Sequence, residues 1–312
     1  MVQIVLIGIG AGLAAALLFA SPLSGTALSF PLFALTGLPV AIAGLGWTPI
    51  AAGVATIVGG AIVLALFSPH GLGVFLLLFA LPMTWLVRLA GLSREGQDGT
   101  EWFPLGRLLV HAAGAVAIGL TAVGYLVGFD AETLATGMTD ALLEWMTANP
   151  ELGPAPNREE LEPFVRFNVA ALPYSIAAIG VIIVVFDLWL AGVVTRASGR
   201  LARPHERLWT ASMPAGAAVA FVVALAASFL PVPLASVAAV VAGAFGCALA
   251  LIGLAVLHAV TIGSNARTVL LTITYFLLIL LGFPILVFAA LGLGETLLHL
   301  RARRFGGAPP AT

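Results

Sequence analysis

The chain has 312 residues, of which 61% are hydrophobic and only 9% are charged, and its mean hydropathy is +1.12. Because so little polar surface cannot cover a water-soluble core, the composition indicates an integral membrane protein. All 13 basic residues are arginines and the net charge is −1, which excludes a P-loop or Schiff-base lysine, leaves any ATP-driven step to another subunit, and disfavours nucleic-acid binding.

Helix-length apolar runs follow one another along the whole chain. A spanning helix needs roughly 20 mostly apolar residues, whereas barrel strands would alternate in hydropathy over about ten residues. We therefore expect an all-α fold, a polytopic transmembrane helical bundle that forms a single domain over residues 1–312. The eight expected spans are 2–20, 29–46, 50–68, 71–88, 108–128, 166–195, 212–230 and 234–258.

The first span carries small residues at spacings of four, namely Gly8, Gly12, Ala16 and Ala20. Such a stripe lets another helix approach closely. The approaching helix is either another span of this chain or a separate transmembrane partner subunit, and the sequence leaves both open. The N-terminus lacks the positive region of a cleaved signal peptide, so we expect this span to be retained.

The arginines gather in short connectors and in the tail. Residues 88–107 contain three arginines, residues 196–207 contain four, and Arg301, Arg303 and Arg304 lie near the C-terminus. By the positive-inside rule all three regions are cytoplasmic, and counting the spans places both termini there as well. Trp47, Trp85 and Trp209 fall near the same ends of the expected spans, where indole rings favour the headgroup region.

The only long polar segment, residues 129–165, is strongly acidic and is expected to be an extracytoplasmic helical insert. Its apolar residues recur at helical spacing, which predicts an amphipathic helix that lies on the membrane surface or covers the bundle. These residues are Leu134, Met138, Leu142, Trp145 and Met146. The sequence 157–160, Asn-Arg-Glu-Glu, has the form of a capping box, so the sixth span is expected to begin above the membrane.

A further apolar stretch, residues 268–300, would measure roughly 50 Å as one straight helix, too long for a bilayer. Gly282-Phe283-Pro284 interrupts it. We therefore expect two half-helices that form a proline-broken hairpin and return the chain to the side on which it started. The segment 35–39, Leu-Thr-Gly-Leu-Pro, is weakly similar to 280–284, and matching broken helices can mark a binding site in transporters.

Asp187 is the most informative polar residue within a span. It lies nine residues before Arg196, hence roughly 13 Å inside the cytoplasmic end of the sixth span. An ionised, unpaired carboxylate at that depth costs several kcal/mol, so we expect it to be paired, protonated or in contact with water. Arg88 and His258 are the candidate partners. Asp187 either clamps helices together or forms part of a substrate or proton site.

Other polar residues within or beside spans are Asn168, Tyr174 and Tyr275, which line a cavity or bond a neighbouring backbone carbonyl. Together Asp187, His258, Arg88, Asn168 and Tyr275 are the candidate substrate-binding residues. Glu295 and His299 are four apart and are expected to share one helical face as an interfacial anchor.

The sequence predicts no metal site, no cofactor and no enzyme. His111, His258 and His299 each stand alone, and no pair has the spacing that places two metal ligands on one helical face. The single cysteine, Cys247, cannot form an internal disulfide. No nucleophile elbow, paired intramembrane carboxylates or Ser/His/Asp arrangement is visible.

Three stretches resemble the YybS-like family of uncharacterised bacterial membrane proteins: residues 188–204, which include Arg-Leu-Ala-Arg-Pro, residues 38–47, and residues 292–301. That family is similar in membrane architecture to the substrate-capturing S-components of energy-coupling-factor vitamin transporters. The resemblance implies a bacterial inner-membrane protein, and docking of the small-residue first helix on a transmembrane partner. Where relatives tend to carry aspartates near the C-terminus, this chain has Glu295 and His299.

Two functions remain open from the sequence. The first is a small-molecule binding or transport component that resembles an S-component and has no ATPase of its own. The alternative is a membrane scaffold or assembly subunit that packs beside a larger complex and moves nothing. An internal cavity beside Asp187 would favour the first, and tightly packed helices would favour the second.

Overall fold

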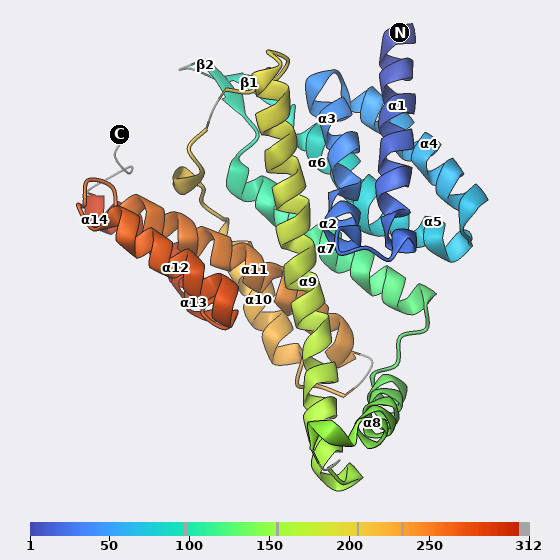
Figure 1. Ribbon diagram of the computed structural model, residues 1–312. Helices are drawn as coiled ribbons and strands as arrows, with labels where there is room; N and C mark the ends of the chain where they lie inside the picture. The colour runs from blue at the N-terminus through green and yellow to red at the C-terminus, as the bar shows by residue number, and fades with distance from the viewer. Residues whose placement is uncertain (97–98, 154–155, 205, 232–233, 306–312) are drawn as a thin grey trace.

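The computed structural model describes residues 1–96, 99–153, 156–204, 206–231 and 234–305. It is an all-α helical bundle with one small β hairpin (Figure 1). The elements of the first half are α1 Val2–Phe19, η1 Ser21–Ser24, α2 Ser29–Ala34, η2 Leu35–Gly37, α3 Leu38–Gly46, α4 Pro49–Leu66, α5 Pro69–Phe75, η3 Leu76–Ala80, α6 Leu81–Ala90, β1 Ser93–Gly96, β2 Gly99–Trp102 and α7 Leu105–Leu126. Those of the second half are α8 Ala131–Ala148, η4 Pro150–Leu152, α9 Arg158–Ala197, η5 Leu208–Thr210, α10 Ala215–Ala227, α11 Leu234–Val260, α12 Arg267–Leu281, α13 Ile285–Leu298 and α14 Leu300–Phe305.

Seven helical stretches among the described residues are long and apolar enough to cross a bilayer. They are Val2–Phe19, Ser29–Gly46, Pro49–Leu66, Pro69–Ala90, Leu105–Leu126, Arg158–Ala197 and Leu234–Val260, which match seven of the expected spans. The stretch expected at 212–230 forms the shorter helix α10. With 13 residues α10 measures roughly 20 Å, because it begins only after Pro214.

The connectors that carry most arginines lie at the same end of the molecule as the N-terminus (Figure 1). Arg203, which follows α9, donates a hydrogen bond of 2.7 Å to the carbonyl of Phe103 and one of 3.4 Å to that of Ala90. These bonds tie the loop after α9 to the ends of the β1–β2 hairpin, which pairs antiparallel from Ser93 with Trp102 to Gly96 with Gly99. The expectation that both connectors share one side is confirmed, whereas this small hairpin was not expected from the sequence.

The small-residue stripe of α1 packs on α4 of the same chain. A Cβ at Gly8 would lie 2.8 Å from the carbonyl oxygen of Ala51, and one at Gly12 would lie 2.7 Å from that of Ala55. Ala16 is also buried. Since α4 occupies this face, Gly8, Gly12 and Ala16 are not free to dock a partner subunit. Ala20, at the end of the stripe, is only partly buried.

Glycine also permits close backbone contact in the C-terminal half. A Cβ at Gly292 of α13 would lie 1.8 Å from the carbonyl oxygen of Leu249, and one at Gly253 of α11 would lie 2.0 Å from that of Phe288. In α11, Gly243 faces the backbone of Tyr174 in α9 in the same way. Dispersion between closely spaced backbones therefore holds α9, α11 and α13 together where the hydrophobic effect is weak.

Helix α9 is the longest element and crosses the whole molecule (Figure 1). Its 40 residues span roughly 60 Å, twice the thickness of the hydrocarbon layer. Of the expected capping box, the N-cap bond is present, in which the Asn157 side chain accepts a hydrogen bond of 2.9 Å from the Glu160 amide. The sixth span thus begins outside the bundle, as predicted.

Helix α8 packs against the protruding end of α9 rather than over the bundle (Figure 1). Ala135 of α8 is buried against Leu161, Val165 and Val169 of α9. The amphipathic helix is therefore present, and it packs on α9 instead of covering the bundle. Met138 and Trp145 on its apolar face remain exposed, so a position on the membrane surface stays a prediction.

The C-terminal apolar stretch is broken into α12 and α13, as expected. Gly282 adopts a positive φ of 68°, which favours glycine, and Pro284 precedes the first residue of α13. The similar segment 35–39 behaves differently. There η2 continues from α2 into α3 with Gly37 at a φ of −75°, so the two segments are not structurally equivalent.

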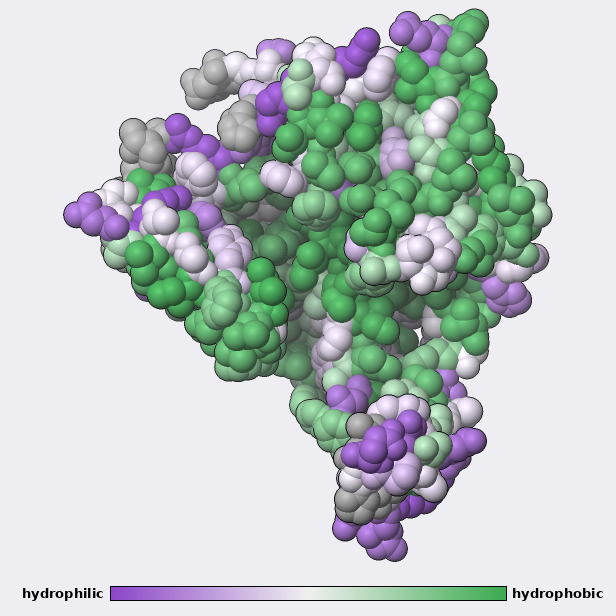
Figure 2. Space-filling view, in the orientation of Figure 1, coloured by the Kyte–Doolittle hydropathy of each residue, from purple (hydrophilic) through white to green (hydrophobic). Residues whose placement is uncertain are grey.

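The surface of the molecule matches a protein that is embedded in lipid. Figure 2 shows hydrophobic residues over the middle of the bundle and hydrophilic residues gathered at the end with the β hairpin and at the end formed by α8 and α9. Large apolar side chains such as Ile57, Ile118 and Ile279 are each more than 70% exposed. Such exposure is stable in a bilayer and not in water.

Candidate functional site

Asp187 lies in the interior of the bundle and is only 1% exposed. Among the described residues no side chain hydrogen-bonds its carboxylate, which has only the backbone of Gly37 as a hydrogen-bonding neighbour. Buried carboxylates normally pair with a cation or accept several hydrogen bonds, because an unpaired charge in a low-dielectric interior is costly. Asp187 is therefore the side chain whose burial most needs a functional explanation.

The carboxylate of Asp187 faces the backbone of Gly37. The position that a Cβ would occupy at Gly37 is 2.9 Å from a carboxylate oxygen of Asp187 and 3.1 Å from the terminal methyl of Met83. A side chain at position 37 would therefore compete with both groups for space. The site is formed by α9, by η2 and by α6.

Two irregular helical segments border this site. The second span is interrupted by the 3-10 turn η2, and the fourth span contains the π-helical segment η3, which contacts η2. Thr36 is fully buried and donates a hydrogen bond of 2.6 Å to the Phe33 carbonyl. Helical irregularities of this kind are frequent at functional sites, because they free backbone groups and loosen the packing.

The partners expected for Asp187 lie elsewhere. Arg88 is exposed near the end of α6. The imidazole Nε2 of His258 is 2.8 Å from the hydroxyl of Tyr275, which joins α11 to α12. The predicted pairing of Asp187 with Arg88 or His258 is therefore wrong. The depth of these residues follows from their distance to the ends of the spans, whereas the rotation of each helix about its axis does not.

The other candidate residues are not brought to this site either. Asn168 is exposed and donates a hydrogen bond of 2.8 Å to the Phe164 carbonyl one turn earlier in α9. This matches the alternative reading in which a polar side chain bonds neighbouring backbone. Of the five candidates, the structure brings only His258 and Tyr275 into contact.

A buried ion pair that the sequence did not predict joins the end of α13 to α14 and to the segment at η5. Arg301 Nε donates a hydrogen bond of 2.9 Å to Glu295, and both side chains are less than 8% exposed. The Arg301 guanidinium also bonds the carbonyls of Trp209 and Ala211. The expected anchor of Glu295 with His299 is wrong, because His299 has a positive φ of 50° and ends α13.

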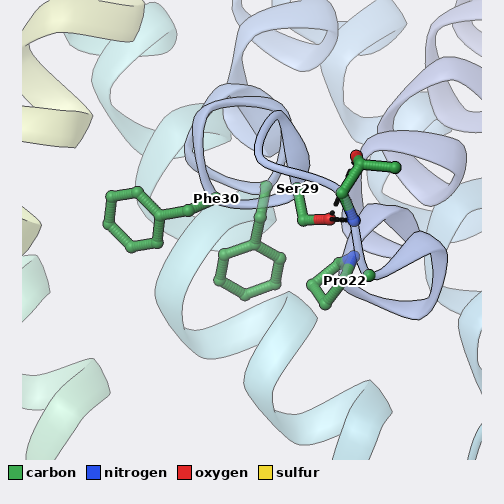
Figure 3. Close-up of a pocket in the computed structure, with 6 residues that line it drawn as sticks. Pro22, Ser29 and Phe30 are labelled. Atoms are coloured by element: carbon green, nitrogen blue, oxygen red, sulfur yellow. Dashed lines mark hydrogen bonds between the residues drawn. The ribbon is translucent and has the colours of Figure 1, made fainter.

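A pocket of about 360 Å³ lies at the N-terminal end of α2, next to η1. Figure 3 shows Pro22, Ser29 and Phe30 around it, with the Ser29 hydroxyl bonded to the adjoining loop. The pocket is also lined by Gly25, Thr26 and Phe33. It therefore combines hydroxyl groups with two aromatic rings.

Phe33 separates this pocket from the interior. Its ring lies 5.5 Å from that of Phe19 and 5.0 Å from that of Phe79, which belongs to η3. Four residues farther along the chain, roughly 6 Å, lies Gly37, beside Asp187. The sequence could not reveal this cluster, because its rings come from separate helices.

Comparisons with models of protein families, with curated proteins and with solved structures found no match for this chain.

Proposed function

We propose that this protein is a small-molecule binding or transport component of the bacterial inner membrane, and that the carboxyl group of Asp187 is its functional group. It has no ATPase of its own and resembles the YybS-like family, which is similar in membrane architecture to the S-components of energy-coupling-factor transporters. The arginine-bearing connectors face the cytoplasm, as do both termini. The positive-inside rule supports this orientation.

The observation that carries the proposal is the buried carboxylate of Asp187 beside the interrupted second span. An ionisable group in a transmembrane interior costs several kcal/mol and is retained mainly where it binds a solute, an ion or a proton. A purely structural clamp would pair it with a cation. The described residues provide none within hydrogen-bonding distance of its oxygens.

The test replaces Asp187 with asparagine, which keeps the shape of the side chain and removes its charge. Purified wild-type protein is screened by thermal shift against panels of cationic, neutral and anionic metabolites, and uptake of each hit is measured in a strain that lacks the gene. We expect Asp187→Asn to lose binding and uptake. The control Glu144→Gln changes an exposed carboxylate of α8 and should retain both.

Equal binding and uptake by Asp187→Asn and wild type would contradict the role of Asp187. A consistent lack of hits and of uptake across broad panels would contradict the binding and transport function itself.

The alternative function, a membrane scaffold, is favoured by α12. This apolar helix buries none of its side chains in the molecule, and Ile279 at its end is 86% exposed. Purification from native membranes under mild conditions separates the two functions. Stoichiometric retention on one complex, together with no response to any metabolite, would support the scaffold.

A further inference from the structure

We propose that Asp187 exchanges a proton with the compartment opposite the arginine-bearing connectors. The proton passes from the α2 pocket to the carboxyl group of Asp187 along a route that runs past Phe33. This inference rests on the proposed function, because it concerns the same carboxyl, and it names the proton as the ligand of that group.

The surroundings of Asp187 favour its neutral form. The elements η2 and α3 contain no titratable residue, and α6 contains only Arg88, which is exposed. Other ionisable side chains lie on the helices that pack on α9. Among the described residues none of them forms a hydrogen bond or ion pair with the Asp187 carboxylate. They are Arg107, His111 and Tyr125 of α7, Cys247 and His258 of α11, and the acidic residues of α8. A carboxyl that is isolated in this way is stable in the closed bundle when it carries a proton.

The α2 side of Asp187 is bordered by a short helix without buried residues and, behind it, by the buried side chains of Thr36 and Met83. Helix α2 has six residues and buries none of them, so its own packing opposes movement only weakly. Phe33 is the side chain of α2 that reaches the aromatic rings of the interior, and the Thr36 hydroxyl bonds its carbonyl. Displacement of Phe33 would open the 360 Å³ pocket toward the buried residues Thr36 and Gly37, and Gly37 is in contact with Asp187.

The barrier on the opposite side is thick. Between Asp187 and the arginine-bearing end, a Cβ at Gly44 would lie 2.5 Å from Val87, and one at Gly46 would lie 3.1 Å from the methyl of Thr195. Val87 is 1% and Thr195 is 2% exposed. The helices α3, α6 and α9 are thus in close contact here, and this side of the site is closed.

The pocket and the arginine-bearing connectors lie at opposite ends of α1. The chain starts at the connector end, and α1 leads to η1 and Ser29 at the other end (Figure 1). With 18 residues α1 spans roughly 27 Å, close to the thickness of the hydrocarbon layer. The α2 pocket is therefore placed to receive protons from the extracytoplasmic side.

The first experiment measures the protonated carboxyl band of the purified protein in lipid nanodiscs by infrared difference spectroscopy across a pH series. Labelling with ¹³C-aspartate separates aspartate bands from those of glutamate. We expect a protonated aspartate band in a dry environment that disappears at high pH. It should be absent from Asp187→Asn and unchanged in Glu144→Gln.

The isotope label keeps this test valid if Asp187→Asn does not fold, because wild type alone then shows whether a buried aspartate titrates. A band that persists in Asp187→Asn, or the lack of a titrating buried aspartate in wild type, would overturn the proposal. If the aspartate band titrates but the protein transports no solute, the proton site is supported and only the transport function is contradicted.

The second experiment tests the route by a pH jump with time-resolved infrared detection. We expect Phe33→Ala to speed the response of the Asp187 band roughly tenfold, since it removes the ring that blocks the route. Phe30→Ala, which changes only the pocket lining, and Val87→Ala, on the opposite side, should leave the rate unchanged. If Val87→Ala speeds the response while Phe33→Ala does not, the proton enters from the arginine-bearing side and the proposed route is wrong.

Discussion

At the scale of single residues, Gly37 offers a way to disturb Asp187 without touching it. A methyl at position 37 would meet only the flexible ends of Asp187 and Met83, and the φ of Gly37 suits any residue. We expect Gly37→Ala to displace the Asp187 carboxyl and to lower the free energy of unfolding by about 1–3 kcal/mol, because the added methyl overpacks a buried site. The infrared band of Asp187 should shift, as measured in nanodiscs.

The matched control is Gly10→Ala, since no atom lies within 4 Å of the Cβ that it would add. It should leave the band in place. A large loss of stability in Gly37→Ala with an unshifted band would show that position 37 serves packing alone.

Arg301 is the residue that ties α13 and α14 to the segment at η5. Arg301→Ala would leave the Glu295 carboxylate buried without its cation, and the expected loss is about 3–5 kcal/mol in the free energy of unfolding. Chemical unfolding in detergent micelles measures it. Arg303→Ala, which changes an exposed arginine of α14, should cost little. Equal losses in the two variants would contradict a structural role for the pair.

At the scale of elements, the pairing of α8 with α9 should depend on pH. Arg166 lies beside Glu132 and holds the pKa of that carboxyl below its usual value. Because the folded pKa is the lower one, the ion pair stabilises the contact above the usual value of 4.5, and this contribution is lost as the pH falls through the folded pKa.

We therefore expect α8 to separate from α9 more readily on acidification below about pH 4.5, with a change in the fluorescence of Trp145. The other tryptophans must be replaced to isolate this signal. Glu132→Gln should remove part of the pH dependence and weaken the contact at neutral pH. An identical acid response in wild type and Glu132→Gln would exclude this ion pair as the cause.

Several elements could be predicted from local sequence, because their signals are local. The N-cap bond at Asn157 and the break at Gly282-Phe283-Pro284 depend on neighbouring residues, and both are present. The position of α8 and the contact of the Gly8 stripe with α4 depend on tertiary contacts between helices that are distant in sequence. Hydropathy shows only that a helix face is apolar or carries small residues. It did not show whether the apolar face of α8 contacts the membrane or α9, or whether the Gly8 stripe contacts a partner subunit or α4.

At the scale of the whole molecule, the spans and the shared side of the two connectors followed from the distribution of apolar residues and arginines. The site did not, because it depends on the rotation of α6, α9 and α11 about their axes. Asp187 was recognised from its depth alone, whereas its neighbour Gly37 and the aromatic cluster around Phe33 come from spans that are distant in sequence. The contacts around Asp187 therefore could be identified only in the assembled bundle.

The orientation of the bundle in the membrane is tested by single-cysteine labelling. Cys247 is buried and is replaced by alanine, and one cysteine is then introduced at Ser93 in the β hairpin, at Ser198 after α9, or at Thr147 in α8, all of which are exposed. In intact cells an impermeant maleimide should label only the cysteine at 147, because the proposed orientation places the other two positions in the cytoplasm with the arginines. Permeabilised cells should label all three. Since Arg203 ties the loop after α9 to the residues that flank the β hairpin, positions 93 and 198 must always behave alike. Labelling of 93 and 198 but not of 147 in intact cells would invert the orientation, and with it the side from which protons reach Asp187.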